Sequence, residues 1–165
     1  MQVRIRQTGA VIFDHEFRKL HFGLGLPHDL TEAILNAWGA DIVFEGPQAT
    51  GGTVYQYSQR DGVEQLEGKW YTKYILGPVF TDRPATDTEP AQTAAEQEAA
   101  YKAMKDAEQA KSVRQTRNDK LAETDWRYRR DQTTTPEWDA YCQALRDVPT
   151  QAGFPWTIVW PTQPE

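Results

Sequence analysis

The sequence is short of the residues that most enzyme and metal sites need, with one cysteine, three histidines and two serines among 165 residues. The single Cys142 excludes an intramolecular disulfide framework and a multi-cysteine zinc site. No two histidines have the i, i+4 spacing of a helical metal site, and neither Ser58 nor Ser112 lies in a nucleophile elbow. The Gly23-Leu24-Gly25 and Gly51-Gly52 stretches lack the flanking pattern of a phosphate loop. We therefore expect no enzyme, with no catalytic residue, no cofactor and no metal.

Long apolar runs and excess positive charge are also absent. No stretch approaches the ~20 apolar residues of a membrane span, and no export signal precedes the first strand pattern. The net charge of −6 argues against a general nucleic-acid binder. Residues 81–110 hold seven acidic and three basic residues, whereas residues 111–130 hold seven basic and three acidic ones. This asymmetry complements the dipole of a single helix. We expect neither a membrane nor a nucleic acid as partner.

The first eighty residues alternate short strand and helix patterns. Asp29 and Glu32 have the spacing of a capping box for a helix around residues 30–38, which Gly39 would end. Asp61-Gly62 and Glu67-Gly68 are typical of hairpin turns. The strands are expected at residues 2–6, 11–13, 42–44, 53–58, 63–66 and 69–76.

A proline-containing polar stretch, residues 81–90, predicts a linker, and the helix-forming composition after it predicts a helix over 91–124. A helix of this length spans about 50 Å. Its narrow apolar stripe consists of Ala100, Ala103, Ala107 and Ala110. Because arginines interrupt the continuation of this stripe, an exposed connector helix is favoured over a seam for weak self-association.

A second, shorter helix is predicted from Thr135-Pro136, a cap followed by a first-turn proline, to Pro149. Trp138, Tyr141, Cys142 and Leu145 share one face of it. A helix of three turns must pack on something. We expect the partners to be the preceding helix, through Leu121 and Trp126, or the segment that follows.

The following segment, residues 154–161, contains two prolines and cannot be a central strand. It is predicted as an edge strand or an extended arm, with Phe154, Trp156, Ile158 and Trp160 on one side. These side chains either fold back on this chain's own helices or cover a partner protein, and the sequence leaves both open. The expected class is α+β: an N-terminal α+β module with antiparallel hairpins (1–80), a linker (81–90), a long connector helix (91–124), and a C-terminal module (125–165) with a short helix and a Trp/Pro-rich arm.

The last third of the chain carries a long ordered motif. Its parts read RNxxLxxTDW from Arg117 to Trp126, WxxYxQALRDxP from Trp138 to Pro149 and FPxxxVWP from Phe154 to Pro161. The motif resembles the phage tail assembly chaperone family, whose members are often described as tail-fibre assembly proteins. Cys142 departs from it, because a long basic residue looks more typical there.

The resemblance implies a phage tail protein that binds a tail-fibre or receptor-binding protein and assists its folding, oligomerisation or attachment. It would act in the host cytoplasm during assembly and then either leave or stay in the virion tail. A permanent structural subunit of the fibre or baseplate is the alternative, and a glycan-binding aromatic platform is a weaker one. The expected partner-binding residues are Trp126, Trp138, Tyr141, Leu145, Phe154, Trp156, Ile158 and Trp160.

Overall fold

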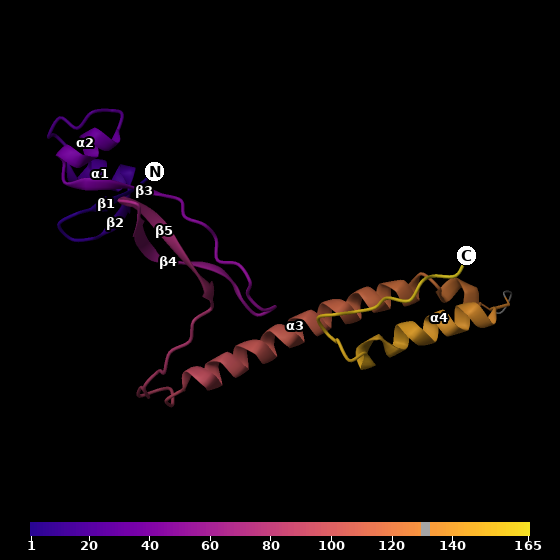
Figure 1. Ribbon diagram of the computed structural model, residues 1–165. Helices are drawn as coiled ribbons and strands as arrows, with labels where there is room; N and C mark the ends of the chain where they lie inside the picture. The colour runs from indigo at the N-terminus through magenta and orange to yellow at the C-terminus, as the bar shows by residue number, and fades with distance from the viewer. Residues whose placement is uncertain (130–132) are drawn as a thin grey trace. The chain divides into compact units, whose positions relative to one another are not determined.

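The computed structural model describes residues 1–129 and 133–165, which form two compact units, Met1–Val79 and Phe80–Glu165 (Figure 1). A mixed sheet with two helices makes up the first unit, and helices dominate the second. The predicted α+β class is confirmed. Arg130, one of the basic residues in the charge asymmetry, lies outside the described residues. Within the described part of the chain, no helix is long and apolar enough to cross a membrane.

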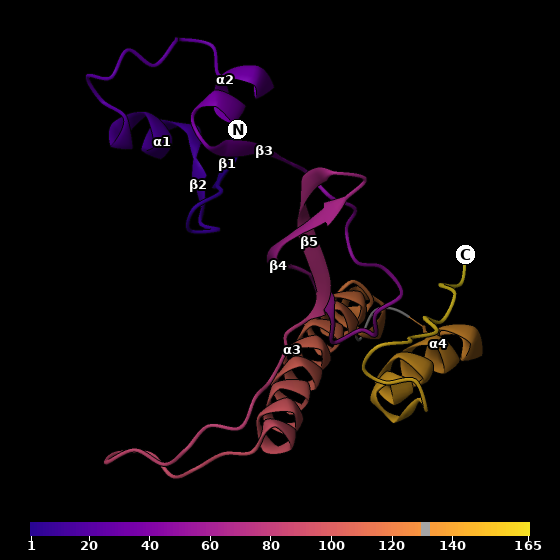
Figure 2. The same ribbon diagram turned by 60° about the vertical axis from the view of Figure 1, so that its left-hand side comes forward.

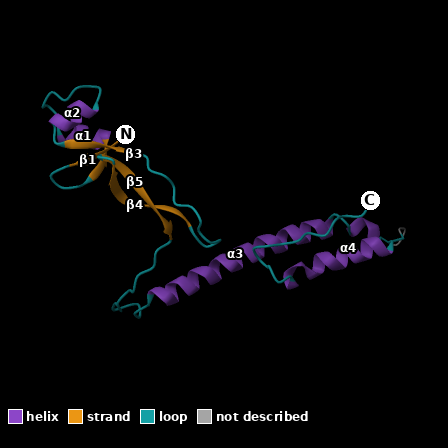
Figure 3. Cartoon of the chain, in the orientation of Figure 1, coloured by secondary structure: helices purple, strands orange, loops and turns teal. Residues whose placement is uncertain are grey.

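The sheet of the first unit has five strands in the order β2-β1-β3-β5-β4. The strands are β1 (Gln2–Ile5), β2 (Val11–Phe13), β3 (Ala40–Phe44), β4 (Tyr57–Leu66) and β5 (Lys69–Gly77) (Figure 3). β3 and β5 pair in parallel, and every other neighbouring pair is antiparallel. The edges of this sheet are therefore the three-residue β2 and the ten-residue β4.

Two short helices, α1 (Asp14–Leu20) and α2 (Glu32–Ala37), supply the rest of the first unit's core. Helix α1 was not expected from the sequence. The core cluster consists of Val3, Phe17, Leu30, Leu35 and Ala40.

The predicted capping box at Asp29 is wrong, because α2 begins after Thr31, whose hydroxyl accepts the Ile34 N–H at 3.4 Å. Leu30 and Leu35 flank this cap and are both in the core cluster. They occupy the two positions of a hydrophobic staple, which fixes where the helix starts. Asp29 remains exposed beside His28.

The turn prediction for the β4–β5 hairpin is half right. Glu67 and Gly68 both have positive φ, 48° and 78°, and they form the hairpin turn as expected. Asp61-Gly62 is not a turn: it lies inside β4 at a register shift between Arg60 and Val63, which is a β-bulge. Residues 53–56 precede β4 and are not part of a strand.

Helix α3 (Ala94–Ala122) forms the long element of the second unit. Its start is well satisfied: the Thr93 hydroxyl accepts the Glu96 N–H at 3.2 Å, and the Glu96 carboxylate accepts the Thr93 N–H at 2.8 Å. The Asp82 carboxylate accepts the Ala94 N–H at 2.7 Å. Residues 81–90, predicted as a linker, fold back in a loop that is closed by two backbone hydrogen bonds between Arg83 and Gln92.

Among the residues that the structure describes, three further helical segments follow: η1 (Asp125–Tyr128), α4 (Pro136–Asp147) and η2 (Val148–Thr150). Helix α4 lies alongside the C-terminal half of α3 (Figure 2). The packed face of α3 contains Ala110 and Val113, each 6 % exposed, and Leu121. Within the predicted alanine stripe, Ala110 is buried, whereas Ala100, Ala103 and Ala107 are exposed, which agrees with the exposed connector helix that was favoured for this part.

Candidate partner-binding surface

The apolar face predicted for α4 is confirmed and forms the centre of the second unit. Trp138, Tyr141, Cys142 and Leu145 are all buried, and Leu121 of α3 and Trp160 of the C-terminal segment pack against them. Pro136 occupies the first turn of α4, and the helix ends at Asp147, close to the predicted Pro149. The structure thus brings all three parts of the predicted motif into one cluster.

A buried hydroxyl joins α3 to α4. Thr124 is 3 % exposed; its Oγ1 donates to the Leu121 carbonyl at 2.7 Å and lies 3.4 Å from the Cys142 Sγ. Cys142 is a free, buried thiol on the predicted apolar face of α4. A small side chain at this position leaves room for Thr124, which a long basic side chain would displace.

An arginine between two tryptophans lies beside this core. The Arg127 guanidinium carbon is 4.4 Å from the centre of the Trp126 ring and 3.6 Å from that of Trp138. Both distances are those of cation–π contacts. Trp126, which was expected to pack on α4 directly, instead remains 47 % exposed and reaches it through Arg127.

Tyr128 connects the same segment to α4. Its hydroxyl donates to Asp139 Oδ1 at 3.0 Å. A hydrogen bond to Cys142, loss of hydration and the Asp139 carboxylate together raise the pKa of Tyr128 above its ordinary value. Burial is also the main reason that the pKa of Tyr141 is raised. Both phenols are therefore neutral at physiological pH.

The C-terminal segment does not begin as the extended chain that was predicted from Phe154. Residues 151–157 form a compact turn, in which the Phe154 N–H donates to the Gln151 carbonyl at 3.0 Å and the Thr157 N–H to the Gly153 carbonyl at 2.7 Å. A Cβ on Gly153 would lie 2.3 Å from the Thr157 carbonyl oxygen, so the turn requires glycine. The extended part starts only at Ile158. We refer to residues 151–165 as the arm.

Gln151 holds the extended part of the arm against the turn. Its side-chain amide donates to the Val159 carbonyl at 2.8 Å, and its side-chain oxygen accepts the Val159 N–H at 2.9 Å. These two bonds imitate the pairing that a neighbouring strand would provide at this one residue.

Three aromatic side chains of the arm contact polar or charged groups of α3. The Trp156 Nε1–H donates to Asp106 Oδ1 at 2.6 Å. The Arg114 guanidinium lies 5.2 Å from the centre of the Phe154 ring, and the Lys120 ammonium lies 5.7 Å from that of Trp160. A hydrogen bond and cation–π contacts thus anchor the arm along α3.

Burial alternates from Trp156 to Trp160, across the end of the turn and the start of the extended part, as predicted for these residues. Trp156, Ile158 and Trp160 are half-buried, whereas Thr157 and Val159 are exposed, Val159 at 74 %. Half-burial means that part of each large apolar side chain still faces outward. The arm therefore folds back on its own helices and also keeps an apolar outer surface.

The structure divides the eight predicted partner-binding residues into two groups. Trp138, Tyr141 and Leu145 lie in the core, so in this conformation they position the surface and do not form it. The remaining five, Trp126, Phe154, Trp156, Ile158 and Trp160, are accessible in part.

Several residues that position the arm were not predicted from the sequence. Asp106 and Gln151 are ordinary polar residues with no motif around them, and only the tertiary fold brings them to their partners. Val148, which is fully buried, and Val113 continue the apolar spacing of α4 and α3, so their periodicity was a usable signal.

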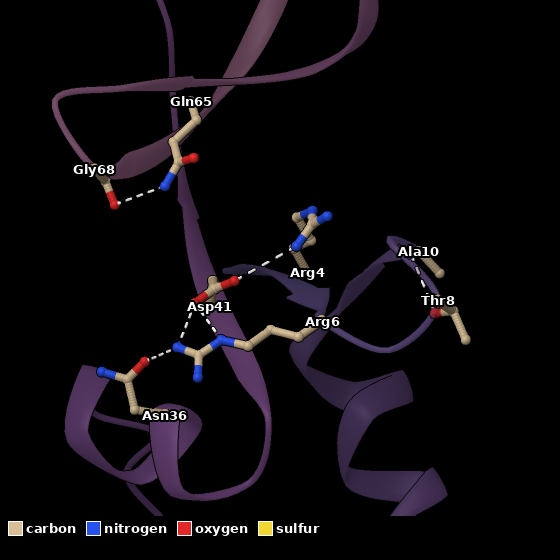
Figure 4. Close-up of polar contacts among 8 residues, drawn as sticks. All are labelled: Arg4, Arg6, Thr8, Ala10, Asn36, Asp41, Gln65 and Gly68. Carbon is tan, nitrogen blue, oxygen red and sulfur yellow. Dashed lines mark hydrogen bonds and ion pairs between the residues drawn. The ribbon is translucent and has the colours of Figure 1, made fainter.

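The first unit contains one notable polar cluster, centred on Asp41 (Figure 4). Its carboxylate contacts Arg6 at 2.6 Å and Arg4 at 3.6 Å, and Arg6 also donates to Asn36. The hydrogen bond to Asp41 raises the pKa of Arg6. The neighbouring cavity is small and is lined in part by Asn36, Asp41 and Trp70. No group of three or more potential ligands that could hold a metal ion is found among the described residues.

Comparison with protein-family models gives a match. The model of the phage tail assembly chaperone protein family matches residues 110–165, about a third of the chain. Comparison with curated proteins and with solved structures gives no match. The matched residues comprise the second half of α3, α4 and the arm, which are the elements that meet in the core described above.

The match confirms the family resemblance predicted for residues 117–164. By this match, residues 110–165 are similar to the phage tail assembly chaperone protein family. This result supports a role for the protein in the assembly of a bacteriophage tail.

Proposed function

We propose that this protein binds a tail-fibre or receptor-binding protein of its phage and assists the folding, oligomerisation or attachment of that protein. The proposal rests on one observation in particular: the aromatic side chains of the arm are anchored on α3 and yet only half-buried. Large apolar side chains that remain accessible on a fixed support are the usual hot spots of protein interfaces. The protein acts by binding alone, without catalysis.

The chemistry of fibre assembly explains why such a surface is useful. A fibre chain that has not yet trimerised exposes apolar surface and unpaired strand edges, both of which favour aggregation. The outer side of the arm offers apolar contact through Val159 and the accessible parts of Trp156 and Trp160. Covering the fibre's exposed surface until assembly is complete would prevent the wrong associations. In this account the protein acts in the host cytoplasm, where tails are assembled.

Co-expression with the tail-fibre protein of the same phage tests the proposal. We expect the amount of soluble, trimeric fibre to rise several-fold when the wild-type chain is present, and the Trp156→Ala/Trp160→Ala variant to lose most of this effect. The matched control is Thr157→Ala, which changes an exposed residue of the same arm. An equal yield of trimer with and without the wild-type chain would contradict the proposal.

The permanent virion subunit remains the second candidate, since the same surface would attach the protein to its neighbour. Mass spectrometry of purified particles separates the two functions. A transient chaperone is absent from mature particles, whereas a structural subunit is present in a fixed ratio to the fibre.

A further inference from the structure

We propose that one backbone edge of the arm, formed by Ile158, Trp160 and Thr162, pairs with an extended strand of the partner protein. This inference rests on the proposed function and names the kind of segment that the arm recognises. We call these three residues the open edge.

The hydrogen bonds of the arm distinguish its two edges. In an extended chain, the N–H and C=O groups of successive residues point to opposite sides. Val159 lies on one side, where Gln151 satisfies both of its backbone groups. For the open edge, the described part of the chain supplies no hydrogen-bond partner to the backbone groups of Ile158, Trp160 or Thr162.

The positions of the prolines agree with this difference. Pro161 lies on the same edge of the arm as Val159. The N–H that proline lacks therefore does not reduce hydrogen bonding along the open edge. The open edge keeps three consecutive N–H donors, and Pro164 then ends the run. An extended segment could therefore exchange backbone hydrogen bonds along three residues of the arm.

Charged side chains protect the edge strand β4 of the first unit from pairing with another strand, but they do not protect the open edge of the arm. Strand β4 carries Arg60, Asp61 and Glu64 and a bulge, which are devices that prevent edge-to-edge pairing. Residues 148–164 contain no charged side chain. The arm therefore has the composition of a segment that accepts a strand.

Charges beside the arm indicate the chemistry of the partner strand that would pair with the open edge. Arg114 and Lys120 contact the rings of Phe154 and Trp160, so a basic row made of these two residues lies beside the arm, together with the acidic Asp106 that Trp156 contacts. A second copy of this chain would bring a second basic row against the first, which is unfavourable. A strand with apolar residues on one face and acidic residues at its ends complements both the arm and the basic row. We commit to such a strand of the partner as the occupant.

Two proline variants with matched sequence contexts test the open edge. Thr162→Pro removes a donor from the open edge, whereas Gln163→Pro removes one from the other edge, and each places a second proline beside an existing one. The measurement is the dissociation constant for the tail-fibre protein by calorimetry. We expect about 3- to 10-fold weaker binding for Thr162→Pro, the range that the loss of one hydrogen bond gives, and little change for Gln163→Pro. Thr162→Val, which keeps the N–H, should bind as wild type does.

Amide exchange gives an independent readout in the complex. The amides of Ile158, Trp160 and Thr162 should become protected on binding, and that of Gln163 should not. Equal effects of the two proline variants, or an equal loss with Thr162→Val, would overturn the open edge while leaving the proposed function intact. A dimer of the chain alone that Thr162→Pro abolishes would show self-pairing and would also overturn the inference. A wild-type chain that does not bind the fibre at all would contradict the proposed function itself.

Discussion

The indole N–H of Trp156 and the carboxylate of Asp106 form a 2.6 Å hydrogen bond across fifty positions of the chain. The bond connects the turn at the start of the arm to the middle of α3. It is charge-assisted, and such bonds are shorter and stronger than neutral ones. The Trp156–Asp106 pair therefore determines where the arm begins its course along the helix.

Replacement of Asp106 by Ala should loosen the arm. We expect a loss of about 1 kcal/mol in the free energy of unfolding, since the bond is partly exposed to water, and faster amide exchange at Val159. A double-mutant cycle with Trp156→Phe isolates the pair, because Asp106 can also lose other contacts. Lys111→Ala, at an exposed position of the same helix, is the control. A coupling energy near zero would show that the pair does not hold the arm.

Leu145 should be the most sensitive position of the second unit, because its side chain is fully buried in the α4 cluster. Leu145→Ala leaves a cavity and should cost about 2–5 kcal/mol. Arg146→Ala, at the next and exposed position of α4, should change stability by less than about 0.5 kcal/mol. Urea denaturation of both variants measures the difference, and similar midpoints would contradict the packing described.

Gly46 should be essential to the first unit for a steric reason. A Cβ at this residue would lie 2.0 Å from the backbone oxygen of Thr72 in β5, which cannot move without breaking the sheet. We expect Gly46→Ala to destabilise the unit by several kcal/mol, whereas Gln48→Ala, at an exposed position of the same loop, should be neutral. Hydrogen exchange resolved by region would show increased exchange in β3 and β5. Unchanged protection in these strands would refute the contact.

Low pH should destabilise the first turn of α3. Hydrogen bonds from the Thr93 backbone and side chain lower the pKa of Glu96 below its ordinary value, so the charged carboxylate is the form that supports the cap. A carboxylate whose pKa is lower in the folded state than in the unfolded state stabilises the fold at pH values above the unfolded-state pKa. This contribution disappears as the pH falls through the lowered folded-state pKa. Protection of the amides of residues 93–97, measured relative to the intrinsic exchange rate at each pH, should therefore fall below about pH 4. In Glu96→Gln this fall should be absent.

The parts of the fold that local patterns determine were predictable. The four apolar positions of α4, its start at Pro136 and the Glu67-Gly68 hairpin depend on residues close in sequence, and all three are as expected. The Asp61-Gly62 pair shows the limit of this reasoning, because the same dipeptide suits a hairpin turn and a bulge. The pairing with β5, on residues farther along the chain, decides between them.

The large apolar side chains of the candidate site were predictable from the sequence, but the turn and the polar contacts that hold them in place were not. Phe154, Trp156, Ile158 and Trp160 were identified from their spacing. The turn before them depends on a close backbone approach at Gly153, which no periodicity reveals. The anchors of the arm are long-range polar contacts, and a sequence contains no local signal for them.

The affinity of the wild-type chain and of its Trp156→Ala/Trp160→Ala variant for the tail-fibre protein tests the central claim most directly. The variant must first show the α-helical spectrum and cooperative unfolding of the wild type. If the arm is the binding surface, the double variant should lose about 2 kcal/mol or more of binding free energy, which is roughly a 30-fold rise in the dissociation constant. A folded double variant that binds the fibre as tightly as the wild type would contradict the account.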